Sequence, residues 1–427
     1  MIMSVLQWLL TGIGLLIAFD IFQQSTDVLG LLRHLRRERR RTNEPTPAVQ
    51  PRAAIILALR GPDPRLRDTL RALSVQEYPD FHVHVVIDSE QDPVLKDVLE
   101  IQESCEDGRI QLSVLRNPSK TCSLKCSSLI QAVHDLDTDV EILAFIDGDA
   151  VPHKTWLQEL VLPLISGEAD VAGGNRWYLP PHAGVGTMAR YFWNAAYMTG
   201  MWAQGAPWAG TMAFHRNTAD RIGLLQAWST AMSVDATLHR CMKNHGLKFK
   251  LVGSLIMTNR EEITVPEFHR WVTRQMAVIR YSASATVRMA EIQVGILLVL
   301  HMVLPVAAVA AFATGAINPG VAALSGLAGY WLVCSLRMIL IERSMRATIQ
   351  QRGETTEWLT PMNILLWYPS VIMVHYIIGT GVLRALQLKQ VDWRGIRYQL
   401  SGNGVVAMAD YKPYGAEWIH TENHSIV

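Results

Sequence analysis

The chain has 427 residues, 49% of them hydrophobic, and a formal net charge of +1 at pH 7. It is too long for one ordinary soluble domain, and its hydrophobic share is high for a soluble enzyme. The near-zero net charge gives no support for nucleic acid as a partner, because binding to phosphate backbones depends on a strongly basic surface.

The first segment has the pattern of a membrane anchor. Residues 1–22 are almost entirely apolar, and a basic run from Arg33 to Arg41 follows them. An apolar span followed by clustered Arg is typical of a transmembrane helix whose next segment lies in the cytoplasm. In the alternative, a cleaved signal peptide, the basic residues precede the apolar run. We therefore expect an anchor over residues 1–24 and a basic cytoplasmic linker over residues 25–50.

The middle of the chain, residues 51–271, alternates between strand and helix patterns. The predicted helices lie between apolar stretches that have the length of buried strands, at residues 53–59, 81–87, 110–115 and 142–146. This alternation predicts an α/β domain with a mostly parallel, Rossmann-like sheet and helices on both faces. Ligands of such sheets bind at the carboxyl ends of the strands.

Acidic residues stand where two of these strands end. The strand at 142–146 runs directly into Asp147-Gly148-Asp149, and Asp88 and Asp92 follow the strand at 81–87. Paired carboxylates at the edge of a core can hold a divalent cation against a diphosphate, because hard cations prefer oxygen ligands and share them with substrate phosphates. The simpler interpretations are an acidic turn for the pair and helix capping for Asp88 or Asp92.

Three further features follow the acidic pair. Trp208-Ala209-Gly210-Thr211 forms a small-residue turn that leads into an apolar strand, and Asp235 begins a helical stretch. Arg270 and Trp271 stand just before the C-terminal apolar segments. An aromatic- and Met-rich stretch at 190–202 predicts either a core helix or a surface that dips into the bilayer to collect a lipid hydroxyl.

The C-terminal third is mostly membrane-like. Three apolar runs, at residues 296–317, 321–341 and 364–386, are each long enough to cross a bilayer. Counting three crossings places the tail outside, whereas Pro361 and Pro369 would permit a re-entrant or interfacial last segment with the tail inside.

Composition divides this third into three parts. Residues 272–291 predict an amphipathic helix lying on the membrane, because Arg alternates there with apolar residues. We then expect a transmembrane region over 292–388 and a tail over 389–427. The five cysteines form no zinc-like pairs, and free thiols agree with a cytoplasmic catalytic domain in an integral membrane protein.

The order of these motifs resembles the family 2-type GT-A glycosyltransferases, and within them the ceramide glucosyltransferase-like branch. The residues from Asp88 to Pro93 resemble the first acidic motif of that branch, and those from Trp393 to Leu400 resemble its Trp-Arg-x-x-Tyr-x-Leu element. The resemblance covers about residues 50 to 400. Two positions depart from it: Glu267 stands where Gln or Arg is usual, and Val234 stands where an acid usually precedes the lone Asp.

The resemblance implies a role for each motif. Asp147 and Asp149 would hold Mg2+ or Mn2+ on the donor diphosphate, and Asp235 would be the catalytic base of a one-step, inverting displacement. The implied donor contacts are Asp88, Asp92, Asp147, Lys125, Arg270 and Trp271, and the implied acceptor contacts are Trp208, Gly210 and Thr211. The simpler interpretations are a solvated lysine for Lys125, an N-cap for Asp235, and an interfacial anchor for Arg270 and Trp271.

The expected function is that of a membrane-bound inverting glycosyltransferase. It would move a sugar, with glucose favoured, from a UDP-sugar to a lipid hydroxyl such as that of ceramide, diacylglycerol or a polycyclic isoprenoid. The alternatives are a processive polysaccharide synthase of the same fold and a non-enzymatic membrane protein with a nucleotide-binding module.

Overall fold

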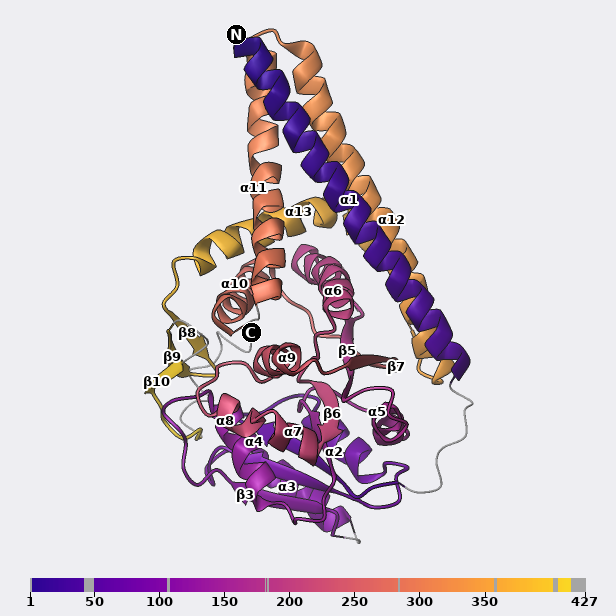
Figure 1. Ribbon diagram of the computed structural model, residues 1–427, viewed down its shortest axis with the longest axis vertical. Coiled ribbons are helices and arrows are strands. Elements are labelled where there is room, and N and C mark those ends of the chain that lie inside the picture. The colour runs from indigo at the N-terminus through magenta and orange to yellow at the C-terminus, as the bar shows by residue number, and fades with distance from the viewer. Residues whose placement is uncertain are drawn as a thin grey trace.

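The computed structural model describes residues 2–41, 50–105, 108–180, 182, 184–282, 285–356, 359–401 and 406–415. An α/β domain lies at one end of the molecule, and long helices extend away from it along the longest axis (Figure 1). Helices α6, α9 and α10 lie between the sheet and these long helices.

A seven-stranded sheet forms the centre of the domain, in the order β3-β2-β1-β4-β6-β5-β7. Strand β1 pairs in parallel with β2 and β4, whereas β6 is antiparallel to both of its neighbours. The predicted α/β class with a mostly parallel sheet is therefore confirmed. The strands are β1 (Ala53–Leu59), β2 (Phe81–Ile87), β3 (Ile110–Val114), β4 (Ile142–Ile146), β5 (Val171–Tyr178), β6 (Thr211–His215) and β7 (Phe249–Asn259).

Helices cover both faces of the sheet because alternate strand residues point to opposite sides. On β1, Ala54 and Ile56 belong to one apolar core with α4, while Ile55 and Leu57 belong to another with α2, α3 and α5. Helices α7, α8 and α9 contribute to the same core as α4, whereas α6 and α10 lie toward the long helices (Figure 1). The domain helices are α2 (Leu66–Ser74), α3 (Val94–Ser104), α4 (Leu124–Asp135), α5 (Trp156–Ile165), α6 (Val185–Gln204), α7 (Arg216–Arg221), α8 (Leu224–Trp228), α9 (Val234–His245) and α10 (Val265–Ser282).

Four long helices complete the chain: α1 (Ile2–Arg41), α11 (Ala285–Ala313), α12 (Ile317–Gln351) and α13 (Pro361–Ala385). Of the described helices, α1, α12 and α13 are long and apolar enough to cross a membrane. These helices fit an integral membrane protein. Helix α1 packs along α12, and α11 and α12 form a hairpin that rises from the domain and returns to it (Figure 1).

The basic segment after the anchor is a helix up to Arg41 and not the predicted linker; residues 42–49 lie outside the described part of the chain. The second half of α1 packs on the α/β domain. Leu31 and Leu35 are fully buried there, and His34 donates a hydrogen bond to the Leu251 carbonyl at 2.7 Å. A Cβ at Gly30 would lie 2.5 Å from the Trp202 ring, so α1 and α6 approach closely there. This packing stabilises a helix that composition alone does not indicate.

Helix α13 lies across the foot of α11, at a steep angle to α1 and α12, and packs on α6 and α10 (Figure 1). The chain then forms an antiparallel sheet of β8 (Gln390–Trp393), β9 (Ile396–Leu400) and β10 (Val406–Asp410). This sheet contacts the α/β domain: Arg60 donates to the Arg394 carbonyl at 3.0 Å, and the Leu124 N–H donates to the Tyr398 hydroxyl at 3.2 Å. The described tail therefore lies on the side of the catalytic domain, and the count that placed it outside is wrong.

The expected amphipathic helix at 272–291 is divided in the structure. Helix α10 begins at Val265 and ends at Ser282, and α11 begins at Ala285. The apolar face of α10, which includes Phe268 and Val272, is buried against α6 and α13. The amphipathic pattern of α10 thus reflects protein packing on one face.

Candidate active site at the carboxyl edge of the sheet

The acidic pair lies at the carboxyl end of β4, next to the turn that begins β6. Ile146 is opposite Thr211 in the antiparallel register, and the Asp147 N–H donates to the Gly210 carbonyl at 3.4 Å. A Cβ at position 210 would lie 2.0 Å from the Trp208 ring, which explains a glycine there. The predicted turn of Trp208, Gly210 and Thr211 therefore meets Asp147 at one edge of the sheet.

Both carboxylates of the pair have a cationic partner. Asp147 forms an ion pair with Lys125, and Asp149 accepts a hydrogen bond from Arg176 at 2.7 Å. Burial alone would raise the pKa of Asp147, but the charges of Lys125 and Arg176 outweigh it and hold the pKa below its usual value. Lys125 is therefore part of the cluster and not a solvated helix lysine.

Asp235 belongs to the same cluster. Burial lowers the pKa of Lys125, but the charges of Asp147, Asp235 and Asp149 together outweigh it and raise that pKa. Asp235 also accepts a hydrogen bond from the Ala209 N–H at 3.3 Å, which ties it to the turn before β6. The sequence separates these acids by almost ninety residues, and the sheet edge brings them together.

The N-cap of α9 is a different residue from Asp235. Ser233 is the N-cap, and its hydroxyl accepts the Ala236 N–H at 3.2 Å. One oxygen of Asp235 also accepts this N–H, at 2.8 Å, while the other points to Ala209. Asp235 therefore supplements the cap and also faces the turn beside Asp147.

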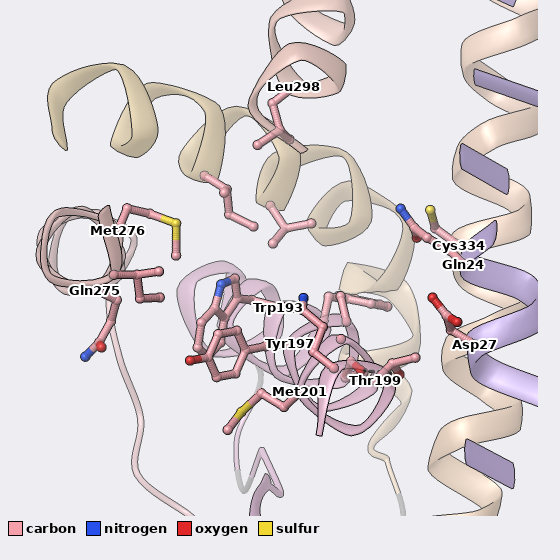
Figure 2. Close-up of a pocket in the computed structure, with 18 of the residues that line it drawn as sticks. Gln24, Asp27, Trp193, Tyr197, Thr199, Met201, Gln275, Met276, Leu298 and Cys334 are labelled. Carbon is pink, nitrogen blue, oxygen red and sulfur yellow. Dashed lines mark hydrogen bonds between the residues drawn. The ribbon is translucent and has the colours of Figure 1, made fainter. Parts of the chain in front are cut away.

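A mostly apolar cavity of about 410 Å³ begins at Asp235 and continues among the membrane-like helices. Figure 2 shows Gln24 and Asp27 of α1 at one end and Gln275 and Met276 of α10 at the other, with side chains of α6 between them. The aromatic-rich stretch forms α6; Trp193 and Met201 line the cavity, whereas Tyr191 is fully buried in the core behind it. The core-helix interpretation thus holds for the face that carries Tyr191, and the interpretation as a lipid-collecting surface stays a prediction.

The two acids after β2 are buried and hold parts of the protein together. Asp88 forms an ion pair with Arg60 and accepts hydrogen bonds from the Tyr411 hydroxyl and the Tyr414 N–H, each at 2.8 Å. Asp92 accepts the N–H groups of Gly61 and Val94, at 2.8 and 3.1 Å, so it joins the loop after β1 to the first residue of α3. Burial raises the pKa of Asp92.

Arg270 and Trp271 lie on α10. The Trp271 ring packs edge-on against Trp193 at a centroid distance of 4.6 Å, and Arg270 is exposed. Neither takes part in the ion pairs or hydrogen bonds of the Asp147–Asp235 cluster described above. The unusual Glu267 has a structural explanation: the Thr264 N–H donates to its carboxylate at 2.8 Å and its own N–H donates to the Thr264 hydroxyl at 3.4 Å, which is a capping box.

Two arginines that the sequence did not indicate as site residues also belong to the cluster. Arg176 lies on β5 and stacks over the Trp208 ring at 4.9 Å in addition to pairing with Asp149. Arg394 lies in the turn between β8 and β9 with a left-handed φ of 48°, and its charge helps to lower the pKa of Asp147. The sequence signal that could have indicated Arg176 is that it is the one charged residue of its strand. For Arg394, the signal is its position inside the Trp393–Leu400 motif.

The side chains of the cluster can supply only some of the ligands that a hard divalent cation needs. Among the described residues there is no cluster of three or more His, Cys, Asp or Glu side chains that could enclose a metal ion. Mg2+ and similar ions are nevertheless held by one or two carboxylates when substrate phosphates and water supply the other ligands. Asp147 and Asp149 provide such a pair, provided that the diphosphate contributes the remaining oxygens.

The family assignment follows from the matched region. The model of the family described as Glycosyltransferase like family 2 matches residues 51–276, more than half of the chain and nearly all of the α/β domain. The chain belongs to this family. The predicted family 2-type GT-A glycosyltransferase, and with it an enzyme, is therefore confirmed.

Several solved glycosyltransferases are similar to this family 2 chain at low identity. The mannosyltransferase PcManGT from Pyrobaculum calidifontis, in complex with GDP-Man and Mn2+, is 14% identical, with 88% of this chain and 97% of that chain covered and a TM-score of 0.46. S. aureus TarS 1-349 with UDP-GlcNAc is 12% identical, with coverage of 84% and 100% and a TM-score of 0.34. Glucosyl-3-phosphoglycerate synthase from Mycobacterium tuberculosis is 15% identical, with coverage of 54% and 79% and a TM-score of 0.35. Among curated proteins, none is a significant match.

Proposed function

We propose that this family 2 glycosyltransferase is a membrane-bound, inverting enzyme that moves a sugar from a UDP-sugar to a lipid hydroxyl. Glucose is the favoured sugar, and ceramide, diacylglycerol or a polycyclic isoprenoid are the candidate acceptors. The ceramide glucosyltransferase-like branch is part of this proposal.

One observation carries the proposal: Asp235 belongs to two environments at once. It shares the charged cluster with Asp147 and Asp149, and it lines the apolar cavity among the membrane-like helices. A lipid in this cavity would bring its hydroxyl to a carboxylate beside the donor site while its apolar part stays among α6, α10 and α13. Positioning of this kind converts a bimolecular reaction into an effectively unimolecular one.

The proposed reaction is a single displacement. The Asp235 carboxylate takes the proton of the lipid hydroxyl, the hydroxyl oxygen bonds to the anomeric carbon, and the bond from that carbon to the diphosphate oxygen breaks. The electron pair leaves with UDP, and one displacement inverts the anomeric carbon. Asp235 is held in place for this step by the hydrogen bonds from Ala209 and Ser233.

The leaving diphosphate needs positive charge, and this chain supplies it from three elements. The charges of Lys125 of α4, Arg176 of β5 and Arg394 of the β8–β9 turn all lower the pKa of the Asp147 carboxyl group. Fixed cations at a developing negative charge stabilise the transition state. Mg2+ or Mn2+ held by Asp147 and Asp149 would add Lewis-acid stabilisation of the same oxygens.

The other predicted contacts remain part of the proposal. Asp88, Asp92, Arg270 and Trp271 are the proposed donor contacts outside the charged cluster. Trp208, Gly210 and Thr211 are the proposed acceptor contacts, which the position of Ala209 beside Asp235 supports. Basic residues at the domain end of α1 and α12 support a cytoplasmic catalytic domain, since clustered Arg favours that side.

The cavity also bears on the alternative functions. A processive polysaccharide synthase needs a polar path for its polymer, whereas this cavity is mostly apolar. Membership in a glycosyltransferase family argues against a non-enzymatic nucleotide-binding protein.

The test is to incubate membranes that contain the protein with a panel of labelled UDP-sugars and Mn2+, and then to extract the lipids. We expect label in the lipid fraction, and its loss in Asp149→Ala and Asp235→Asn. A surface variant, Asp139→Asn, is the matched control and should behave as wild type. Label in a high-molecular-weight polymer, or full lipid labelling by Asp235→Asn, would overturn the proposal.

A further inference from the structure

The two acids after β2 cannot reach a ligand while the C-terminal tail is in place. The Asp88 side chain is fully buried, and Asp92 is 1% exposed. One oxygen of Asp88 accepts the Tyr411 hydroxyl at 2.8 Å. The other oxygen accepts the Tyr414 N–H at 2.8 Å and a hydrogen bond from Arg60. A donor contact at Asp88 therefore requires that the tail release this carboxylate.

Residues 411–415, which we call the strap, lie over the loops that follow β1 and β2. The Tyr414 ring packs on the first of these loops, because a Cβ at Gly61 would lie 2.8 Å from it. The Arg60 guanidinium lies over the same ring, 5.3 Å from its centroid. In the second loop, the Ser89 hydroxyl donates to the Tyr414 carbonyl at 2.7 Å. Ligands of such sheets bind at the carboxyl ends of the strands, so the strap fills space that a ligand would use.

The loop after β1 connects the strap to the charged cluster. Arg60 donates to the Arg394 carbonyl at 3.0 Å, and the charge of Arg394 helps to lower the pKa of Asp147. In the same loop, burial and the charge of Asp149 raise the pKa of Asp63. Strand β1 lies between β2 and β4 in the sheet. A nucleotide with its diphosphate at the end of β4 would therefore reach the strap when its nucleoside extends along the sheet edge toward β2.

Tyr414 presents the kinds of group that a uracil ring also presents. Its N–H donates to the Asp88 carboxylate and its carbonyl accepts from the Ser89 hydroxyl. Uracil is a flat ring with an N–H between two carbonyl groups, so it can donate to the same carboxylate and accept from the same hydroxyl. The strap and a uridine nucleotide therefore compete for one set of hydrogen-bonding groups.

We propose that the strap is an autoinhibitory contact that occupies the nucleoside end of the donor site. The UDP-sugar binds when the strap has left Asp88, and the Arg60–Asp88 ion pair stays in place. A ligand that binds only the open state has an apparent Kd raised in inverse proportion to the open fraction, so the strap sets the affinity for the donor. The inference rests on the proposed function, because the donor contact at Asp88 is part of that proposal.

An engineered disulfide tests the proposal, because it can hold the strap closed. A Cβ at Gly415 would lie 3.7 Å from the Cβ of Gln91, a separation that suits a disulfide. The full-length double variant Gln91→Cys/Gly415→Cys, in lipid nanodiscs, is oxidised with diamide or reduced with dithiothreitol. The oxidised form should bind UDP with Mn2+ about a hundredfold more weakly than the reduced form, measured by titration calorimetry. The two single variants, treated alike, are the matched controls and should bind UDP as wild type does.

A weakened strap should have the opposite effect. Tyr411→Phe removes one hydrogen bond to Asp88, so the strap opens more often. The Kd for UDP and the KM for the UDP-sugar should both fall by about tenfold, the contribution of one hydrogen bond to a charged group. A strap that formed part of the nucleoside site would give the reverse, a higher Kd. Tyr368→Phe, which removes the hydroxyl of an exposed tyrosine on α13, is the matched control and should leave the Kd unchanged.

The outcomes separate the inference from the proposed function. The inference fails if no disulfide forms, if the oxidised double variant binds UDP as tightly as the reduced one, or if Tyr411→Phe binds UDP no more tightly than wild type. Transfer of label to lipid by wild type would then leave the proposed function standing. If wild type binds no UDP and labels no lipid, the proposed function fails, and the inference fails with it.

Discussion

Arg60 and Asp88 form a buried ion pair that joins the first two strands of the sheet to the C-terminal tail. Arg60 follows β1 and Asp88 follows β2, and the same carboxylate accepts hydrogen bonds from Tyr411 and Tyr414 of the tail. Arg60 also donates to the Arg394 carbonyl, so the pair fixes the turn that brings Arg394 to the charged cluster. The ion pair therefore links the tail to the active site.

Asp88→Asn should destabilise the protein by about 3–5 kcal/mol, because removal of one partner leaves a buried charge without compensation. Denaturant unfolding in detergent and limited proteolysis of the tail measure this effect. Asp410→Asn is the matched control, since its pair with Arg397 is exposed and should contribute less than about 1 kcal/mol. Equal destabilisation by both changes would contradict the assigned role of Asp88.

Arg176→Ala should raise KM for the UDP-sugar by about tenfold to a hundredfold, the usual contribution of a hydrogen bond to a charged group. Arg176→Lys should recover only part of this loss, because an ammonium cannot bond bidentately to a diphosphate. Steady-state kinetics with varied donor measures both. Arg221→Ala, which breaks an exposed ion pair with Asp170, should leave KM unchanged. An unchanged KM in Arg176→Ala would remove this residue from the donor site.

Chelation should abolish most of the transfer, and added Mn2+ should restore it. Asp149→Ala should make the residual activity insensitive to the chelator, because the carboxylate pair that holds the ion is lost. Transfer rates with and without EDTA, for wild type and variant, measure this. Wild-type activity that persists fully in EDTA would show that Lys125, Arg176 and Arg394 neutralise the diphosphate without a metal.

The capping box at the start of α10 should give a pH-dependent contribution to stability. Hydrogen bonds from Thr264 lower the pKa of Glu267 from its ordinary value of 4.5. Since the folded pKa is the lower one, the contribution is fully present above the unfolded pKa and is lost as the pH falls through the folded value. The difference in Tm between wild type and Glu267→Ala should therefore shrink below about pH 4.

Glu267→Gln is the control for this pH effect, because Gln also completes a capping box but carries no titratable group. It should stay close to wild type in Tm at neutral pH, and its difference from Glu267→Ala should not change with pH. A difference between wild type and Glu267→Ala that stays constant from neutral to acidic pH would contradict the assignment.

Local sequence patterns predicted much of the fold. The strands Ala53–Leu59 and Phe81–Ile87 have their predicted bounds, because each carries its own apolar pattern. The Asp147–Asp149 pair was also visible, since paired acids directly after a buried strand conflict with burial.

Features that depend on distant contacts could not be predicted in this way. The docking of Leu31 and Leu35 turns a basic linker into a helix, and the contacts of Asp88 with Tyr411 and Tyr414 join residues more than three hundred positions apart. Arg176 becomes a site residue only when β5 lies beside the turn at Trp208. No local period encodes such contacts, and the cavity needs side chains from seven helices before it exists.

The flat course of α13 changes the membrane topology that we expect for this chain. Among the described helices, α1, α11 and α12 extend away from the domain, whereas α13 lies across the foot of α11 (Figure 1). If α1, α11 and α12 are the helices that cross, we expect the amino-terminal end of α1 and the β8–β10 sheet on opposite sides of the membrane. An epitope placed before α1 and one placed after β10 would be reached by antibodies from opposite sides of a sealed vesicle.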